Sequence, residues 1–409
     1  MASQTGNQAS EPGFLSEAAR RIKPSASNAA SQRARELSAS GRSIVDLTTG
    51  EPDFATPAHI CEAAIAAMQA GQTRYTTVDG TLQLKQAITQ KFLRDNELEY
   101  TPQEISVAAG AKQIIFNALL ATLNPGDEVV IPLPCWVSYV EMVTFAGGKA
   151  VTIAPRPGGF DTLLQEVEKS ITPRTKWLMI NSPNNPSGVV YTRDQLRALA
   201  DLLLRHPHVW VLTDDIYEHI VFDGRRFFTL AQVEPRLKAR TLTVNGVSKA
   251  YSMTGWRIGY AGGPQPLIRA MAKIQSQSTS APCSISQAAA VAALDGPQDL
   301  VHERARIFQH RRDLLLKEFE TIPGIRPNAP EGAFYLFLDC AELMGKRTPQ
   351  GQTLASDQDL VEYFLEHAGV AMVHGTPFGA PGHLRLSFAA SEANLTEACR
   401  RLRQACSQL

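Results

Sequence analysis

The chain has 409 residues, of which 44% are hydrophobic and 20% charged, the composition of a soluble globular protein long enough for two lobes. Forty lysine and arginine residues balance forty aspartate and glutamate residues, so no net charge favours nucleic acid or an anionic membrane. Six cysteines without a C-x-x-C pair argue against a zinc site and a disulfide framework, so we expect no metal and a reducing, cytoplasmic location.

The N-terminal residues 1–15 are mostly small and polar. They lack the basic start and the apolar run of a signal peptide, and we expect them to form a loose tail. No apolar run anywhere in the sequence approaches the length that spans a membrane.

Short β-branched runs then alternate with helical patterns. The patterns predict strands at 105–109, 128–131, 149–153, 177–180, 209–213 and 240–244, and helices at 113–123 and 193–205. Such alternation is typical of an α/β domain whose largely parallel sheet is covered on both faces. Ligands of these sheets bind at the carboxyl ends of the strands.

The last hundred residues have a different pattern. A long charged and apolar helix is predicted at 299–321, as a bridge into a second lobe. Strands are predicted at 333–338 and 383–388, and helices at 357–368 and 392–406 with Ser356 and Ser391 as N-caps. The chain therefore ends in a compact α+β lobe.

A lysine-containing segment follows the predicted strand 240–244. Residues 245–259 read N-G-V-S-K-A-Y-S-M-T-G-W-R-I-G, with Lys249 eight residues before Arg257. An amine that is partly desolvated and close to positive charge has a lowered pKa and forms imines readily. An arginine fork can grip a phosphate. For a lone lysine and a lone arginine, a pair of surface side chains is the favoured alternative.

Polar residues follow two other predicted strands. Asp214 and Asp215 end the strand 209–213, with Tyr217 close behind, and a turn-forming carboxylate is the alternative. Asn185 lies in the segment N-S-P-N-N-P-S-G at 181–188, which is turn chemistry in any case.

Four further candidates have structural alternatives that weigh at least as much as a functional role when each residue is taken alone. Gly110-Ala111-Lys112 joins a strand to a helix, where exposed amides favour phosphate, although an ordinary turn accounts for it equally well. Trp136 could be plain core and Tyr75 core or surface. Arg385 alternates with apolar residues and could be a solvated side chain on a strand.

Taken together, these segments resemble the class I pyridoxal-phosphate aminotransferases, and the similarity extends from Lys23 to the last helix. The nearest subgroup is that of bacterial aspartate and aspartate/prephenate aminotransferases. The resemblance implies the fold type I of pyridoxal-phosphate transferases, an α/β fold with a mostly parallel seven-stranded sheet and a smaller α+β domain. The implied division is a tail at 1–15, a segment at 16–48 that packs with the small domain, a large cofactor-binding domain at 49–300 and a small domain at 301–409.

The resemblance also gives each cofactor-side residue a role. Lys249 is expected to hold pyridoxal 5'-phosphate as a Schiff base and to act as the general base. Asp214, the acid of the D-x-x-Y pattern, pairs with the pyridine nitrogen, Tyr217 with the ring oxygen, and Trp136 stacks on the ring. The resemblance further implies these contacts: Asn185 to the ring oxygen, and Gly110, Ala111, Lys112, Arg257 and the partner subunit's Tyr75 to the phosphate.

On the substrate side, Arg385 is expected to grip the α-carboxylate, together with Asn185 and the backbone of Gly50, next to the ring-stacking Trp136. Lys23 and Lys112 are expected to contact the distal carboxylate. Two positions depart from related enzymes. Ser27 replaces a threonine of the N-terminal substrate-closing segment. Gly246 replaces a serine that contacts the phosphate, a loss for which Ser248 or a serine of the second subunit could compensate.

The function implied is transfer of an amino group from L-aspartate or a related amino acid to 2-oxoglutarate, by a ping-pong reaction in a homodimer. Alternatives are an aminotransferase with another donor (prephenate/glutamate, aromatic or alanine type) and, less favoured, a pyridoxal-phosphate lyase. A nicotinamide enzyme is disfavoured because no G-x-G-x-x-G follows a first strand.

Overall fold

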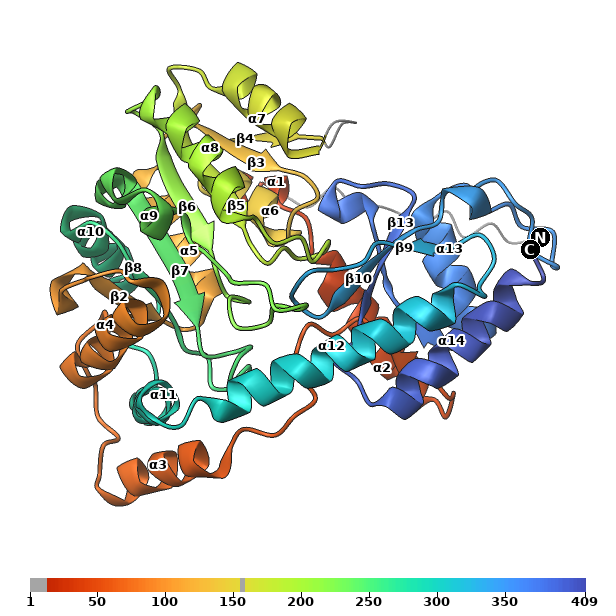
Figure 1. Cartoon of the computed structure of the whole chain (residues 1–409), viewed down its shortest axis with the longest axis horizontal. Coiled ribbons are helices and arrows are strands. Elements are labelled where there is room, and N and C mark those ends of the chain that lie inside the picture. Colours follow the sequence, from red (N-terminus) through yellow and green to blue (C-terminus); the bar gives the residue numbers. More distant parts are fainter. Residues whose placement is uncertain (1–12, 155–158) are drawn as a thin grey trace.

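A computed structural model describes residues 13–154 and 159–409 of the chain (Figure 1). Most of the predicted tail, residues 1–12, lies outside this range. Within the described residues, no helix is both long and apolar enough to cross a membrane.

The larger part of the molecule is built on a seven-stranded sheet. Its strands, in spatial order, are β2 (Ile105–Ala108), β8 (Gly259–Gly262), β7 (Thr241–Gly246), β6 (Trp210–Asp214), β5 (Thr175–Asn181), β3 (Glu128–Pro132) and β4 (Lys149–Ile153). All are parallel except β8, which runs antiparallel to both of its neighbours. The predicted mostly parallel seven-stranded sheet is confirmed, and each of the six predicted strands lies within two residues of its observed bounds.

Both faces of this sheet are buried. Along β3, Val129 and Ile131 enter one core cluster and Val130 another, as the two-residue period of a strand requires. The first cluster is covered by α5 (Ala111–Thr122), α6 (Ser138–Phe145) and α10 (Gln265–Ser276), and the second by α7 (Gly159–Ser170), α8 (Arg193–Leu204), α9 (Leu230–Val233) and the 3-10 helix η2 (Pro235–Arg240).

A third cluster closes the β2 edge of the sheet. It joins α3 (Ala58–Gln69), α4 (Leu82–Asn96) and α11 (Ser284–Asp295) to residues of β2 and β8. A short 3-10 helix, η1 (Pro102–Glu104), leads into β2.

The long helix α12 (Asp299–Phe319) runs from this part of the molecule to a smaller α+β part (Figure 1). There an antiparallel sheet has the order β12 (Val373–His374), β13 (His383–Ser387), β10 (Tyr335–Asp339) and β9 (Arg326–Pro327). Around it lie η3 (Ala341–Leu343), α13 (Asp357–Tyr363), a π-helical turn η4 (Phe364–Ala368), η5 (Thr376–Phe378) and α14 (Glu392–Cys406). The long predicted helices at both ends of this part are confirmed, as are Ser356 and Ser391 as N-caps.

Two predictions in this part need correction. The strand predicted at 333–338 begins only at Tyr335, because Ala333 has a left-handed backbone with φ +59°. The helix predicted at 357–368 changes to a π-helical turn at Phe364 and ends at Gly369 with φ +63°.

The described N-terminal residues contact both parts of the molecule. Helix α1 (Glu17–Arg21) lies against α6, where Arg21 Nη2 donates to the Phe145 carbonyl at 2.9 Å. Helix α2 (Ala26–Ala39) contacts β12 and β11 (Val370–Ala371), and β1 (Val45–Asp46) pairs in parallel with β11. The N-terminal segment therefore reaches the edge at which the two parts meet.

Candidate active site

A cavity of about 430 Å³ opens at the carboxyl ends of β5, β6 and β7. This volume lies within the range of small-molecule and cofactor sites. The cavity lining includes these predicted residues: Ser27, Gly50, Ala111, Lys112, Trp136, Asn185, Asp214, Tyr217, Ser248, Lys249, Arg257 and Arg385. Segments more than 300 residues apart in the sequence thus supply one site.

Lys249 lies in the loop after β7, at the centre of this cavity. Its Nζ donates to the carbonyl oxygen of Gly50 at 2.6 Å. Burial and the positive charge of Arg257 lower the pKa of Lys249 to about 8. The uncharged amine, the form that acts as nucleophile and base, is therefore far easier to reach near neutral pH than for an ordinary lysine.

Asp214 ends β6 and is buried. The Tyr139 hydroxyl donates to its Oδ2 at 2.6 Å, and Asn181 Nδ2 donates to its backbone carbonyl at 2.7 Å. Burial raises the pKa of Asp214 to about 6, even though the hydrogen bond from Tyr139 acts to lower it. The adjacent Asp215 does not line the cavity, so of the two acids considered only Asp214 faces the site.

Aromatic side chains form the walls. The Tyr217 and Tyr335 hydroxyls lie 2.8 Å apart. Trp136 packs edge-to-face against Tyr139, and Lys112 Nζ lies 4.8 Å from the centre of a Trp136 ring. Partial burial and the nearby Arg257 lower the pKa of Lys112. The cavity therefore combines flat apolar surface with positive charge.

Arg385 lies on β13 and is only 2% exposed. Its Nη1 donates to Asn185 Oδ1 at 3.1 Å, its Nη2 donates to the Thr48 carbonyl at 2.7 Å, and its Nε is buried without a partner among the described residues. A buried guanidinium that pairs with no carboxylate is costly unless an anion completes it. The Ser27 hydroxyl, in the same cavity, also has no partner within the described chain.

The start of α5 presents a second group of hydrogen-bond donors. Gly110, the N-cap, has φ +93° and ψ 159°, a conformation open essentially to glycine alone, and gives the helix no side-chain cap. A Cβ at Gly110 would lie 2.3 Å from Arg257 Nη2, and one at Gly259 would lie 2.0 Å from the Ala111 nitrogen. The glycines thus let a guanidinium and uncapped helix amides converge, an arrangement that favours phosphate.

Three predicted site residues do not line the cavity. Gly110 lies just behind it, against Arg257. Lys23 is exposed, and its backbone nitrogen donates to Glu141 Oε2 at 2.8 Å. Tyr75 is 97% exposed on the surface of the single chain.

The glycine that departs from related enzymes is also outside the lining. Gly246 ends β7, where a Cβ would lie 3.0 Å from Ile216 Cδ1 and 3.1 Å from the Ile258 carbonyl. The backbone of β8 and the Ile216 side chain therefore fill the space that a serine would need, whereas Ser248 faces the cavity.

Several site residues were not anticipated. Tyr139 and Asn181 lie in segments that the motifs marked, but their bonds to Asp214 depend on how β5, β6 and α6 pack. Tyr335 belongs to a predicted strand that was given no role in the site. One face of α2 also lines the cavity, through residues at the i, i+3 and i+7 positions: Asn28, Ser31 and Arg35.

A family model described as aminotransferase class I and II matches residues 42–402. Among curated relatives, an aspartate aminotransferase of Rhizobium meliloti is 55% identical over 378 residues, which are 92% of each chain. An aspartate/prephenate aminotransferase of Cereibacter sphaeroides is 51% identical over 397 residues, 97% of this chain and 99% of that one.

Solved structures agree with these relatives. The crystal structure of the Rhizobium meliloti aspartate aminotransferase matches with a TM-score of 0.93 at 52% identity, over 97% of this chain and 99% of that chain. The Thermus thermophilus aspartate aminotransferase, in a structure with maleate, matches with a TM-score of 0.88 at 43% identity, over 96% and 99% of the two chains.

Proposed function

Because the chain belongs to the class I and II aminotransferase family, we propose that it transfers the amino group of L-aspartate to 2-oxoglutarate, with pyridoxal 5'-phosphate as cofactor. The observation that carries this proposal is one cavity that holds a buried amine, Lys249, a buried carboxylate, Asp214, and an incompletely bonded buried guanidinium, Arg385.

The donors in the cavity fit this cofactor. The amides at Ala111 and Lys112 and the Arg257 guanidinium would bind its phosphate, and Trp136 offers a ring for stacking. Asp214 would pair with the ring nitrogen and Tyr217 and Asn185 with the ring oxygen. When bound, the cofactor supplies an electron-withdrawing ring that stabilises negative charge at the substrate Cα.

The chain's own residues then position the substrate and move its proton. Arg385 binds the α-carboxylate with its unfilled Nε, and Asn185 keeps the guanidinium in place. Lys249 Nζ, as the uncharged amine, would take the proton from the substrate Cα and deliver it to the aldehyde carbon of the cofactor, and in the second half-reaction it would move a proton in the opposite direction. The reaction is ping-pong, because the same residues serve the amino acid in one half-reaction and the 2-oxo acid in the other.

A preference for a dicarboxylic substrate follows from the charges left in the cavity. Lys112 and Arg35 both line it, and the Ser27 hydroxyl has no partner among the described residues. The Thermus relative was solved with maleate, itself a dicarboxylate. Lys23 would reach the distal carboxylate only if the segment around residues 23–27 closed over the cavity, and we retain its contact as part of the proposal.

The working unit proposed is a cytoplasmic homodimer, in which the partner subunit's Tyr75 contacts the phosphate. The 97% exposure of Tyr75 in the single chain supports a position at an interface.

The test is a coupled assay of the purified full-length protein with pyridoxal 5'-phosphate, aspartate and 2-oxoglutarate. We expect oxaloacetate and glutamate to form in equal amounts, and the Lys249→Ala variant to form neither. Absence of wild-type turnover, or near-normal turnover by Lys249→Ala, would contradict the proposal. A panel with prephenate, aromatic amino acids and alanine distinguishes the other donors, of which prephenate is favoured by the name of the Cereibacter relative.

A further inference from the structure

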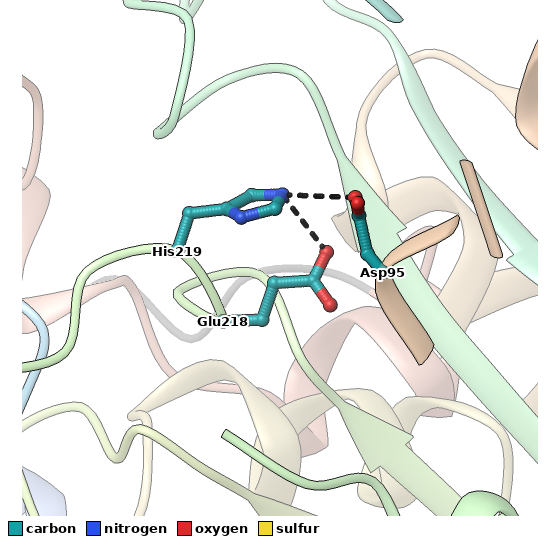
Figure 2. A group of neighbouring side chains, drawn as sticks. All are labelled: Asp95, Glu218 and His219. Carbon is teal, nitrogen blue, oxygen red and sulfur yellow. Dashed lines mark ion pairs between the residues drawn. The ribbon is translucent and has the colours of Figure 1, made fainter. Parts of the chain in front are cut away.

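A cluster of buried charge lies behind the cavity, between α4 and the loop that follows β6. Figure 2 shows Asp95, Glu218 and His219 facing one another, with their ligand-type atoms all within 4.8 Å. A metal ion is one occupant to consider for two carboxylates and an imidazole. The Lys91 ammonium, however, is already ion-paired with Glu218 and lies 3.9 Å from Asp95 Oδ2, so the cluster contains its own cation.

Glu218 takes part in several of these contacts, and both of its carboxylate oxygens accept hydrogen bonds. Asn96 Nδ2 donates to Oε2 at 2.8 Å, and Asn245 Nδ2 donates to Oε1 at 2.7 Å. The Lys91 ammonium and, at 3.3 Å, His219 Nε2 also lie at Oε1. Burial alone would raise the pKa of Glu218, but Lys91 and His219 outweigh it and lower that pKa, so the carboxylate is ionised.

The positions of these partners in the sequence connect the cluster to the active site. Glu218 directly follows Tyr217 and lies four residues after Asp214. Asn245 lies in β7, four residues before Lys249. The hydrogen bond between Glu218 and Asn245 therefore joins the loop that carries Tyr217 to the strand that leads into Lys249.

Helix α4 fixes this junction from behind. Lys91 and Asn96 both come from α4, and Lys91 Nζ donates to Asn96 Oδ1 at 2.7 Å. Both side chains are 1% exposed, and neither lines the cavity. The junction thus rests on a rigid, water-excluded support, outside contact with the reactants.

We propose that Glu218 is a positioning residue for the aminotransferase reaction, which holds Tyr217 and Lys249 at a fixed separation through Asn245. The inference rests on the proposed function, because it concerns the two segments that would hold the cofactor. It acts through the arrangement of these segments, since Glu218 itself does not line the cavity.

The test is Glu218→Gln in the full-length protein. A glutamine has one acceptor oxygen and one amide group, so it cannot accept from both Asn96 and Asn245. We expect the Kd of pyridoxal 5'-phosphate, from titration of the cofactor-depleted protein, to rise about tenfold. We expect kcat to fall roughly 10- to 100-fold with little change in the KM of aspartate, because the reacting groups are displaced while Arg385 remains in place.

A second variant restores the hydrogen bond between residues 218 and 245, with the donor and the acceptor exchanged. In Glu218→Gln/Asn245→Asp, the glutamine amide can donate to the new carboxylate, and the net charge of the junction stays the same. We expect this double variant to fold and to recover Kd and kcat to within about threefold of wild type, a difference of under 1 kcal/mol.

The matched control is Glu234→Gln, which removes another buried carboxylate that is ion-paired, there with Arg197 and Arg236, away from the cavity. If Glu218→Gln lowers the thermal midpoint as this control does but leaves Kd and kcat unchanged, Glu218 is merely structural and the inference is overturned. It is also overturned if the folded double variant is no better than the single one. A wild-type protein that does not bind pyridoxal 5'-phosphate would instead contradict the proposed function.

Discussion

At the scale of single residues, the site shifts the pKa values of buried ionisable groups towards neutral pH. The carboxyl of Asp214 has a raised pKa and the amine of Lys249 a lowered one, both mainly because of burial. Each shift lowers the free energy of unfolding over part of the pH range. Each also gives the site a group that can gain or lose a proton when a partner binds. Stability is therefore exchanged for reactivity at these two positions.

The Asp214→Asn variant of the cofactor-free protein should be more stable at neutral pH. Because the folded pKa of about 6 lies above the ordinary value of 3.8, ionisation of Asp214 opposes folding. The cost begins as the pH rises above about 4, is complete above about 6, and reaches up to about 3 kcal/mol. Asparagine cannot ionise and removes it.

Urea unfolding from pH 4 to pH 8 measures this effect. The stability difference between Asp214→Asn and wild type should grow across that interval and vanish at its acidic end. The variant should also lose transaminase activity, because an amide cannot keep the ring nitrogen protonated. A stability difference that is independent of pH would contradict the assignment.

Arg35 offers a test of substrate choice at a residue that is safe to change. It is exposed and lines the cavity, so Arg35→Gln should fold normally. We expect the KM of aspartate to rise about tenfold and that of alanine to be unchanged, since a charged hydrogen bond is worth roughly 1.5–3 kcal/mol and only aspartate has a distal carboxylate.

The matched control is Arg33→Gln, on the same helix, where the arginine pairs with Glu366 instead of lining the cavity. Steady-state kinetics with both amino acids decides the matter. Equal effects of the two variants, or an equal loss for aspartate and alanine, would remove Arg35 from the substrate site.

At the scale of elements, the sequence predicts what local patterns determine. The serine N-caps predicted the starts of two C-terminal helices correctly, and apolar runs predicted six of the seven strands of the large sheet. The seventh strand, β8, reads G-Y-A-G and has no β-branched residue to mark it. The change to a π-helical turn at Phe364 likewise has no local signature.

The site was predictable for a related reason. Residues at strand ends, such as Asp214 and Asn185, belong to contiguous motifs and were found in the sequence. Tyr139 and the buried cluster around Glu218 were not, because their partners come from other elements and only the packing of those elements brings them together.

The conformation at the start of α5 depends on Gly110, and this leads to a further prediction. Gly110→Ala would place a Cβ against Arg257 and hold alanine at φ +93°, a strain of about 1–3 kcal/mol. We expect the displaced guanidinium and helix start to weaken pyridoxal 5'-phosphate binding about tenfold.

Gly351→Ala is its control, since Gly351 has φ +85° and open space around its Cα. Titration of the cofactor-depleted variants should show weakened binding for Gly110→Ala only, although both lose stability. Unchanged affinity in Gly110→Ala would exclude the α5 start as the phosphate site.

At the scale of the whole molecule, we propose the division into a segment at 16–48, a large domain at 49–300 and a small domain at 301–409. Val45 and Leu47 share a core cluster with residues of the C-terminal part, and Arg385 reaches from β13 to the Thr48 carbonyl. Arg385, which we propose binds the substrate, thus lies where the proposed segment, large domain and small domain meet.

The homodimer gives a prediction at the same scale. Sedimentation of the wild-type protein should give twice the 44.6 kDa of one chain. Tyr75→Phe should keep that mass and raise the Kd of pyridoxal 5'-phosphate several-fold, because it removes one hydroxyl contact of about 1 kcal/mol supplied by the partner subunit. A fully active monomer would contradict the shared site.

The antiparallel strand β8 has a consequence for which cofactors the chain can keep. The chain leaves the sheet at Gly246 and returns at Gly259, and this single excursion carries both Lys249 and Arg257, the latter at φ +55°. The proposed anchor of the cofactor, Lys249, and the proposed ligand of its phosphate, Arg257, are therefore separated by one length of backbone. We expect a vitamer without the phosphate to react with Lys249 but to lack the contact with Arg257, so the chain should retain the phosphorylated form.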